Sequence, residues 1–169
     1  MHSTVENLLK IQTKVKLKFE NKNKDLNSTP KIIAVSKTFG MENIKPLINN
    51  GHIDFGENKV QEAQLKWAFI KKQNKSIKLH LIGKLQTNKV KAAVKLFDYI
   101  HSLDNKKLAD KIQQQENDNN LKTKIFIQVN IGSEEQKSGI SVDEIPDFYN
   151  YCKSINLNII GLMCIPPIN

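Results

Sequence analysis

Short apolar segments alternate with helix-like segments through almost the whole chain. Apolar runs occur at residues 32–35, 53–55, 77–82, 99–100, 125–129 and 159–165. Before the first run and between successive runs, apolar residues recur at three- and four-residue spacing, which is typical of amphipathic helices. Strands that alternate with helices predict a parallel sheet covered by helices, because each helical crossover returns the chain to start the next strand in the same direction. The chain is therefore expected to be an α/β protein.

Two architectures share this alternation, an open doubly wound sheet and a closed (β/α)8 barrel. A barrel needs about eight strands and typically about 250 residues, so the six predicted strands in 169 residues are about two βα units short. No glycine-rich loop follows the first predicted strand, which argues against a Rossmann-type dinucleotide site. We expect one domain over residues 1–169, with an N-terminal helix and linker at 1–29 and the strand–helix units at 30–169.

The net charge of +9 raises nucleic acid as a partner, but all 26 basic residues are lysines. Arginine binds phosphate and guanine with two hydrogen bonds, so its absence favours a solvated basic surface over a nucleic-acid interface.

No apolar run approaches the roughly 20 residues of a membrane span, and no secretory leader is evident, so a cytoplasmic location is expected. Cys152 and Cys164 match no metal or redox spacing, and the histidines form no HExxH-type cluster.

Polar and reactive side chains gather where the predicted strands end. Ligands bind at the carboxyl ends of strands in both architectures, and those ends share one rim when the strands are parallel. His80 lies inside the third predicted strand. The residues at or just after the strand ends are Lys37, Glu57, Asn58, Gly83, Lys84, His101, Ser102, Asn130, Met163 and Cys164.

Lys37 is the sharpest candidate for chemistry. It has the same strand parity as Val35, so it is predicted to point to the inside of the sheet while Ser36 points away. A lysine amine at a barrel mouth can form a Schiff base with a carbonyl compound. By position alone, Lys37 could equally be one more surface lysine, Glu57 a helix cap and His80 a hydrogen-bonded core histidine.

Six ordered motifs resemble those of the pyridoxal phosphate homeostasis proteins, which are single-domain relatives of the alanine racemase barrel. They are collinear and cover nearly the whole chain from Lys31 onward, which makes them far more specific together than singly. The motifs are residues 34–38 (AVSKT), 54–62 (DFGENKVQE), 80–89 (HLIGKLQTNK), 101–104 (HSLD), 128–130 with 137–139 (QVN and KSG), and 161–167 (GLMCIPP).

The resemblance implies a (β/α)8 barrel of the alanine racemase N-terminal type, with about its first six βα units present. It implies pyridoxal 5′-phosphate held as a Schiff base on Lys37, with Asn58, His80 and Met163 beside the ring. The implied role is intracellular vitamin B6 homeostasis without catalytic turnover. Expected partners are pyridoxal phosphate and apo-enzymes that depend on it, with no nucleic acid, no membrane and a monomeric complete protein.

The family continues with a Met-Ser-x-Asp segment and an Arg-Ile-Gly segment that cradle the phosphate, and neither occurs here. The chain is therefore expected to be a C-terminally truncated piece with the lysine half of the site, and with Val35, Val129 and Leu162 partly uncovered on the inner face. Two other functions stay open: a pyridoxal-phosphate-dependent amino-acid racemase, and a basic nucleic-acid-binding module. Racemases of this type carry an additional β-domain and a tyrosine acid/base from it.

Overall fold

The computed structural model describes residues 1–20, 29–132 and 138–166. Helices and strands alternate along the chain as the hydrophobic pattern predicts. The helices are α1 (Ser3–Glu20), α2 (Met41–Asn49), α3 (Val60–Gln73), the 3-10 turn η2 (Thr87–Lys89), α4 (Val90–Leu96), α5 (Lys106–Asn119) and α6 (Ile145–Ser154). The strands are β1 (Ala34–Val35), β2 (Asp54–Glu57), β3 (Lys78–Leu81), β4 (Tyr99–Leu103), β5 (Lys124–Gln128) and β6 (Ile159–Met163).

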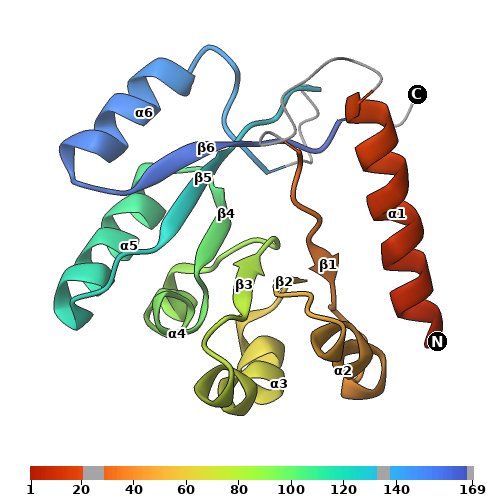
Figure 1. Ribbon diagram of the computed structural model, residues 1–169. Helices are drawn as coiled ribbons and strands as arrows, with labels where there is room; N and C mark the ends of the chain where they lie inside the picture. The colour runs from red at the N-terminus through yellow and green to blue at the C-terminus, as the bar shows by residue number, and fades with distance from the viewer. Residues whose placement is uncertain (21–28, 133–137, 167–169) are drawn as a thin grey trace.

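The six strands form one parallel sheet in the order β1-β2-β3-β4-β5-β6, so each strand pairs with its neighbour in sequence. The sheet curves strongly, with α2 to α6 along its outer side and α1 beside β1 and α2 (Figure 1). This arrangement confirms the predicted α/β class and the barrel-like course of the chain. Among the described residues, β1 and β6 each pair with one strand only, so the barrel is not closed.

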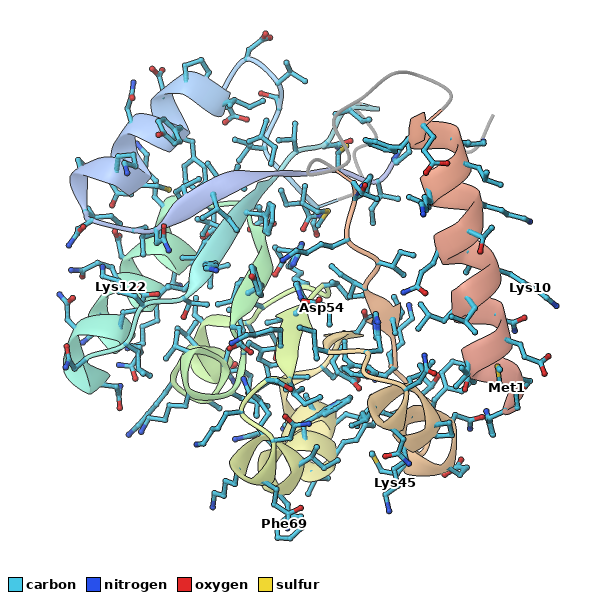
Figure 2. The ribbon with its side chains drawn as sticks, in the orientation of Figure 1. Met1, Lys10, Lys45, Asp54, Phe69 and Lys122 are labelled. Atoms are coloured by element: carbon cyan, nitrogen blue, oxygen red, sulfur yellow. The ribbon has the colours of Figure 1, made fainter. Side chains whose placement is uncertain are left out.

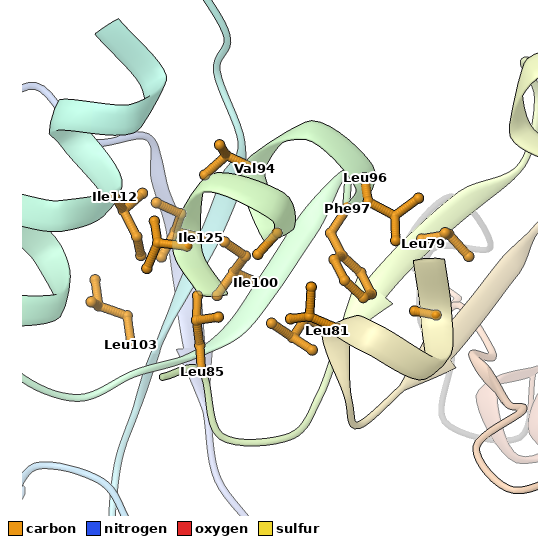
Figure 3. Close-up of a cluster of buried hydrophobic side chains, with 14 of the residues drawn as sticks. Leu79, Leu81, Leu85, Val94, Leu96, Phe97, Ile100, Leu103, Ile112 and Ile125 are labelled. Carbon is orange, nitrogen blue, oxygen red and sulfur yellow. The ribbon is translucent and has the colours of Figure 1, made fainter. Parts of the chain in front are cut away.

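The main core lies between the outer side of the sheet and the helices. Alternate strand residues point outward into it, and Leu79, Leu81, Ile100, Ile125 and Ile127 are fully buried there. Figure 3 shows several of these side chains packed with residues of α4 and α5, including Val94 and Ile112. Burial of this apolar surface is the dominant stabilising term for the sheet–helix unit.

The inner face of the sheet carries a different set of side chains. Gly56 packs against Ile33 and Ile82, and Gly161 packs against the Phe126 ring, so these residues share the concave side. Leu162 neighbours Gly161 and therefore points to the opposite side, where it is 52% exposed. The prediction that Leu162 belongs to the inner face is wrong.

Val129 belongs to the outer side as well, and for the same reason. It alternates with Gln128 and shares its direction with Ile127, which lies in the core. Val129 is buried, so the prediction that it would be partly uncovered on the inner face is also wrong. Of the three residues expected on that face, only Val35 is both exposed and directed inward.

Several boundaries differ from the predictions. Glu57, His101 and Ser102 lie within β2 and β4 rather than after them. The N-cap of α5 is Asn105, whose side-chain oxygen accepts a hydrogen bond from the Leu108 N–H at 2.9 Å. Polar residues on the inner face had shortened the predicted strands, because hydrophobicity alone reports mainly the outer face.

The start of α6 follows the expected rule for proline. Pro146 lies in the first turn of the helix, where its missing N–H breaks no hydrogen bond. Ser141 donates to the Glu144 carboxylate through its backbone N–H and its hydroxyl, at 2.8 and 2.7 Å, which orders the approach to the helix.

Across residues 1–20, 29–132 and 138–166, no helix has the length and apolarity to cross a membrane, and no cluster of three metal-ligating side chains occurs.

Candidate functional site

Lys37 follows β1 directly, in a turn at the carboxyl end of the sheet. The two residues before it face opposite sides of the sheet. Val35 is 45% exposed on the inner side, whereas Ser36 is 4% exposed and directs its hydroxyl outward to Glu57 at 2.8 Å. Lys37 stands in the turn just beyond β1 and is exposed, and its inward direction stays a prediction from strand parity.

Asn58 lies at the same rim, directly after β2, the strand that pairs with β1. Val35 pairs with Gly56, so Lys37 and Asn58 each stand two residues beyond a paired position on neighbouring strands. The loop after β3 closes tightly against Asn58. A Cβ atom on Gly83 would lie 2.4 Å from the Asn58 carbonyl oxygen, so only glycine allows this approach.

His80 lies deeper, within β3, and is 5% exposed. Its Nε2 is 3.1 Å from Asp54 Oδ1, and its Nδ1 is 2.9 Å from His101 Nε2. Because a carboxylate can only accept, His80 carries its proton on Nε2 and accepts at Nδ1 from the N–H of His101. These three residues, Asp54, His80 and His101, are called the inner relay below; Asp54 lies near the middle of the molecule in Figure 2.

Aromatic rings hold the inner relay in place. Tyr99 stacks on His80 with ring centroids 4.2 Å apart, and Phe126 stacks on His101 at 4.4 Å. Burial lowers the pKa of His80, although its hydrogen bond to Asp54 opposes the shift. Burial and the neighbouring His80 lower the pKa of His101 to about 4. Both imidazoles are therefore neutral at pH 7.

Met163 is the last residue of β6, at the opposite edge of the sheet from Lys37. Its carbonyl accepts from the Val129 N–H at 2.8 Å, and it is half-buried. The sheet thus places Lys37 and Asn58 just beyond the ends of the adjacent strands β1 and β2, sets His80 below that rim on β3, and places Met163 at the far edge of the sheet. The Lys137 position of the fifth motif lies outside the described residues.

The inner relay was only partly visible in the sequence. In the sequence, His80 and His101 are separate candidates, and Asp54 belongs only to a longer motif. A signal that could join them is strand alternation. On each of the three strands the polar residue is next to a buried apolar residue that points outward, so all three polar side chains face the inner side. Strand register, which pairs Gly56 with His80 and His80 with Tyr99, completes the alignment.

Residues 17–168 match the family model for the alanine racemase N-terminal domain. The pyridoxal phosphate homeostasis protein of Aquifex aeolicus is 40% identical over 138 residues, which is 81% of this chain and 60% of that protein. The protein of the same name from Haemophilus influenzae is 36% identical over 161 residues, which is 95% of this chain and 68% of that protein.

Solved structures agree with these relatives. PipY of Synechococcus elongatus with pyridoxal phosphate bound has a TM-score of 0.76 at 30% identity, over 90% of this chain and 70% of that one. Alanine racemase of Clostridium difficile has a TM-score of 0.65 at 12% identity, over 82% of this chain and 36% of that one. The racemase shares the fold, and at this identity the likeness extends no further.

Proposed function

Since the chain belongs to the pyridoxal phosphate homeostasis proteins of the alanine racemase N-terminal domain family, we propose that it binds pyridoxal 5′-phosphate through Lys37 and serves its intracellular supply. The observation that carries this proposal is the position of Lys37, which is exposed at the carboxyl rim of the sheet, two residues after the inward-facing Val35. The chain spans 60% of the Aquifex relative's length, so the role of the whole protein is part of the proposal.

The residues at this rim fit the cofactor by their chemistry. Lys37 offers a primary amine for the aldehyde, and Asn58 offers an amide that both donates and accepts hydrogen bonds. When bound, pyridoxal phosphate supplies an electron-withdrawing ring conjugated to the lysine-linked carbon. Met163, at the end of β6, is proposed as an apolar neighbour of the ring from the other edge of the sheet.

The proposed contribution of His80 is structural support beneath the ring. Both of its nitrogens are used within the inner relay, and Tyr99 covers one face of its imidazole. A neutral, doubly hydrogen-bonded His80 keeps a fixed orientation on β3, two strands from β1, and holds its proton on Nε2 toward Asp54. The imidazole of His80 therefore adds no charge of its own beneath the proposed ring. Hydrogen bonds to the cofactor are left to residues at the rim.

Binding without sustained turnover is the function favoured over a racemase. Relatives at 36% and 40% identity are named pyridoxal phosphate homeostasis proteins, whereas the alanine racemase structure shares 12% identity and the fold alone. A cytoplasmic location and the delivery of pyridoxal phosphate to apo-enzymes are proposed with this function. Nucleic acid is not proposed as a partner, because all 26 basic residues are lysines and none offers the two-pronged grip of arginine.

A titration of the chain with pyridoxal phosphate tests the proposal. The absorption band of the lysine-bound cofactor should appear with the wild-type chain and be lost in Lys37→Ala. Lys84→Ala is the matched control, because Lys84 is also an exposed lysine at the same rim, after β3. An undiminished band in Lys37→Ala, or loss of the band in Lys84→Ala alone, contradicts the proposal.

A further inference from the structure

The backbone on both sides of Lys37 is held by side chains of α3. On one side, Lys66 Nζ donates to the Ser36 carbonyl oxygen at 2.8 Å. On the other side, the Thr38 N–H donates to Glu62 Oε1 at 2.8 Å. Lys66 Nζ also lies 3.1 Å from Glu62 Oε1, so an ion pair connects the two side chains that hold the backbone.

A buried carboxylate anchors this arrangement. Glu57 is fully buried, and its Oε1 accepts from Ser36 Oγ at 2.8 Å, Lys66 Nζ at 2.9 Å and Trp67 Nε1 at 2.9 Å. A buried charge is tolerated where it is paired and hydrogen-bonded, and Lys66 supplies the opposite charge here. Glu57, Glu62 and Lys66 are called the lysine clamp below.

The backbone at Thr38 has an unfavourable conformation that the lysine clamp supports. Thr38 has φ of 63°, in the left-handed region that β-branched residues rarely adopt. Such a conformation persists where the surrounding structure over-determines it, and it is concentrated at functional sites. The hydrogen bond from Thr38 to Glu62 supports this conformation one residue after Lys37.

We infer that Glu62 and Lys66 are positioning residues that set the place and direction of the Lys37 amine for its bond to pyridoxal phosphate. This inference rests on the proposed function and adds the residues that prepare Lys37 for it. A lysine side chain has many rotamers, so its reactive geometry depends on a fixed Cα and fixed flanking peptides. The lysine clamp acts through the backbone, since its polar atoms bind Ser36 and Thr38.

Glu62 offers the cleaner test, because its side chain is 32% exposed and its replacement leaves the core intact. Glu62→Ala removes the acceptor for the Thr38 N–H, whereas Glu62→Gln keeps an oxygen acceptor there. The readout is the rate at which added pyridoxal phosphate attaches to Lys37, followed by stopped-flow absorption. We expect attachment to be roughly tenfold slower in Glu62→Ala, and within about twofold of wild type in Glu62→Gln.

The Lys66 half of the clamp needs a paired variant. Lys66→Met alone strands the buried charge of Glu57 and is expected to unfold the chain. The double variant Glu57→Gln/Lys66→Met removes both charges together and should show the same slowing as Glu62→Ala. Lys71→Met is the matched control, because Lys71 on the same helix bridges the Leu96 carbonyl and Asp98 far along α3 from Lys37.

The outcomes separate the clamp from the proposed function. If the wild-type chain itself takes up no cofactor on Lys37, the proposed function fails and the inference fails with it. If wild type takes it up and Glu62→Ala matches its rate, the clamp is overturned while the function stands. Equal slowing in Lys71→Met, or no recovery in Glu62→Gln, would also overturn it, because a general loss of stability would then explain the effect.

Discussion

Acidification from pH 7 to pH 5 should destabilise the fold through His101. Burial lowers the pKa of His101 to about 4 in the folded chain, against an ordinary value of 6.5. Between these values the unfolded chain binds a proton that the folded chain excludes. Stability from the neutral imidazole is therefore present above pH 6.5 and is lost as the pH falls toward 4.

The expected loss follows from the size of this shift. At pH 5 the unfolded histidine is almost fully protonated and the folded one is almost fully neutral, and one pKa unit corresponds to about 1.4 kcal/mol. Titration over about 1.5 pH units below the ordinary value gives about 2 kcal/mol, and residual solvent access reduces this to about 1–2 kcal/mol. The lowered pKa of His80 adds a loss of the same sign.

His101→Gln isolates the contribution, because glutamine keeps an N–H for His80 Nδ1 and does not titrate. The assay is urea unfolding of both chains at pH 7 and pH 5, with stability compared at each pH. The difference between the chains cancels the opposite contribution of Glu116, whose pKa is raised by burial. If the variant loses as much stability as wild type, the burial of His101 is not the cause and the argument is refuted.

Three further predictions concern the rim, the lysine clamp and enzymatic turnover. Gly83→Ala forces a Cβ within 2.4 Å of the Asn58 carbonyl oxygen, so retention of pyridoxal phosphate through dialysis should fall about tenfold, and retention equal to wild type would contradict it. Trp67→Phe removes the indole N–H that binds Glu57 at 2.9 Å, and urea unfolding should show a loss of about 2–3 kcal/mol. Assays for racemase, decarboxylase and transaminase activity should show no sustained conversion of a free amino acid; rates of about 1 per second or more would reject this prediction.

The order of strands and helices was predictable because hydrophobic periodicity reports the outer core directly. Leu79, Leu81, Ile125 and Ile127 form apolar runs in the sequence and lie buried under helices in the structure. Polar inner-face residues such as His101 interrupt that signal, which is why β4 was predicted too short. Leu65 is apolar and lies on α3, yet it is 92% exposed, because one helical face alone contacts the sheet.

The location of the candidate site was predictable, but the hydrogen bonds around it were not. The end of the first predicted strand placed Lys37 at the rim, and the surrounding motifs indicated pyridoxal phosphate as its ligand. Glu62 and Lys66 stand at i and i+4 on a helix, a spacing that most often marks an exposed surface pair. Their contact with the backbone of Ser36 and Thr38 depends on how α3 packs against β1 and β2, which no local pattern encodes.

The most direct test of the central claim is the identity of the lysine that carries the cofactor. The chain is incubated with pyridoxal phosphate, reduced with borohydride to make the link permanent, digested, and mapped by mass spectrometry. The account predicts the reduced cofactor on the peptide that contains Lys37, with the label lost in Lys37→Ala. Label on Lys84 or Lys89 in place of Lys37 would contradict it.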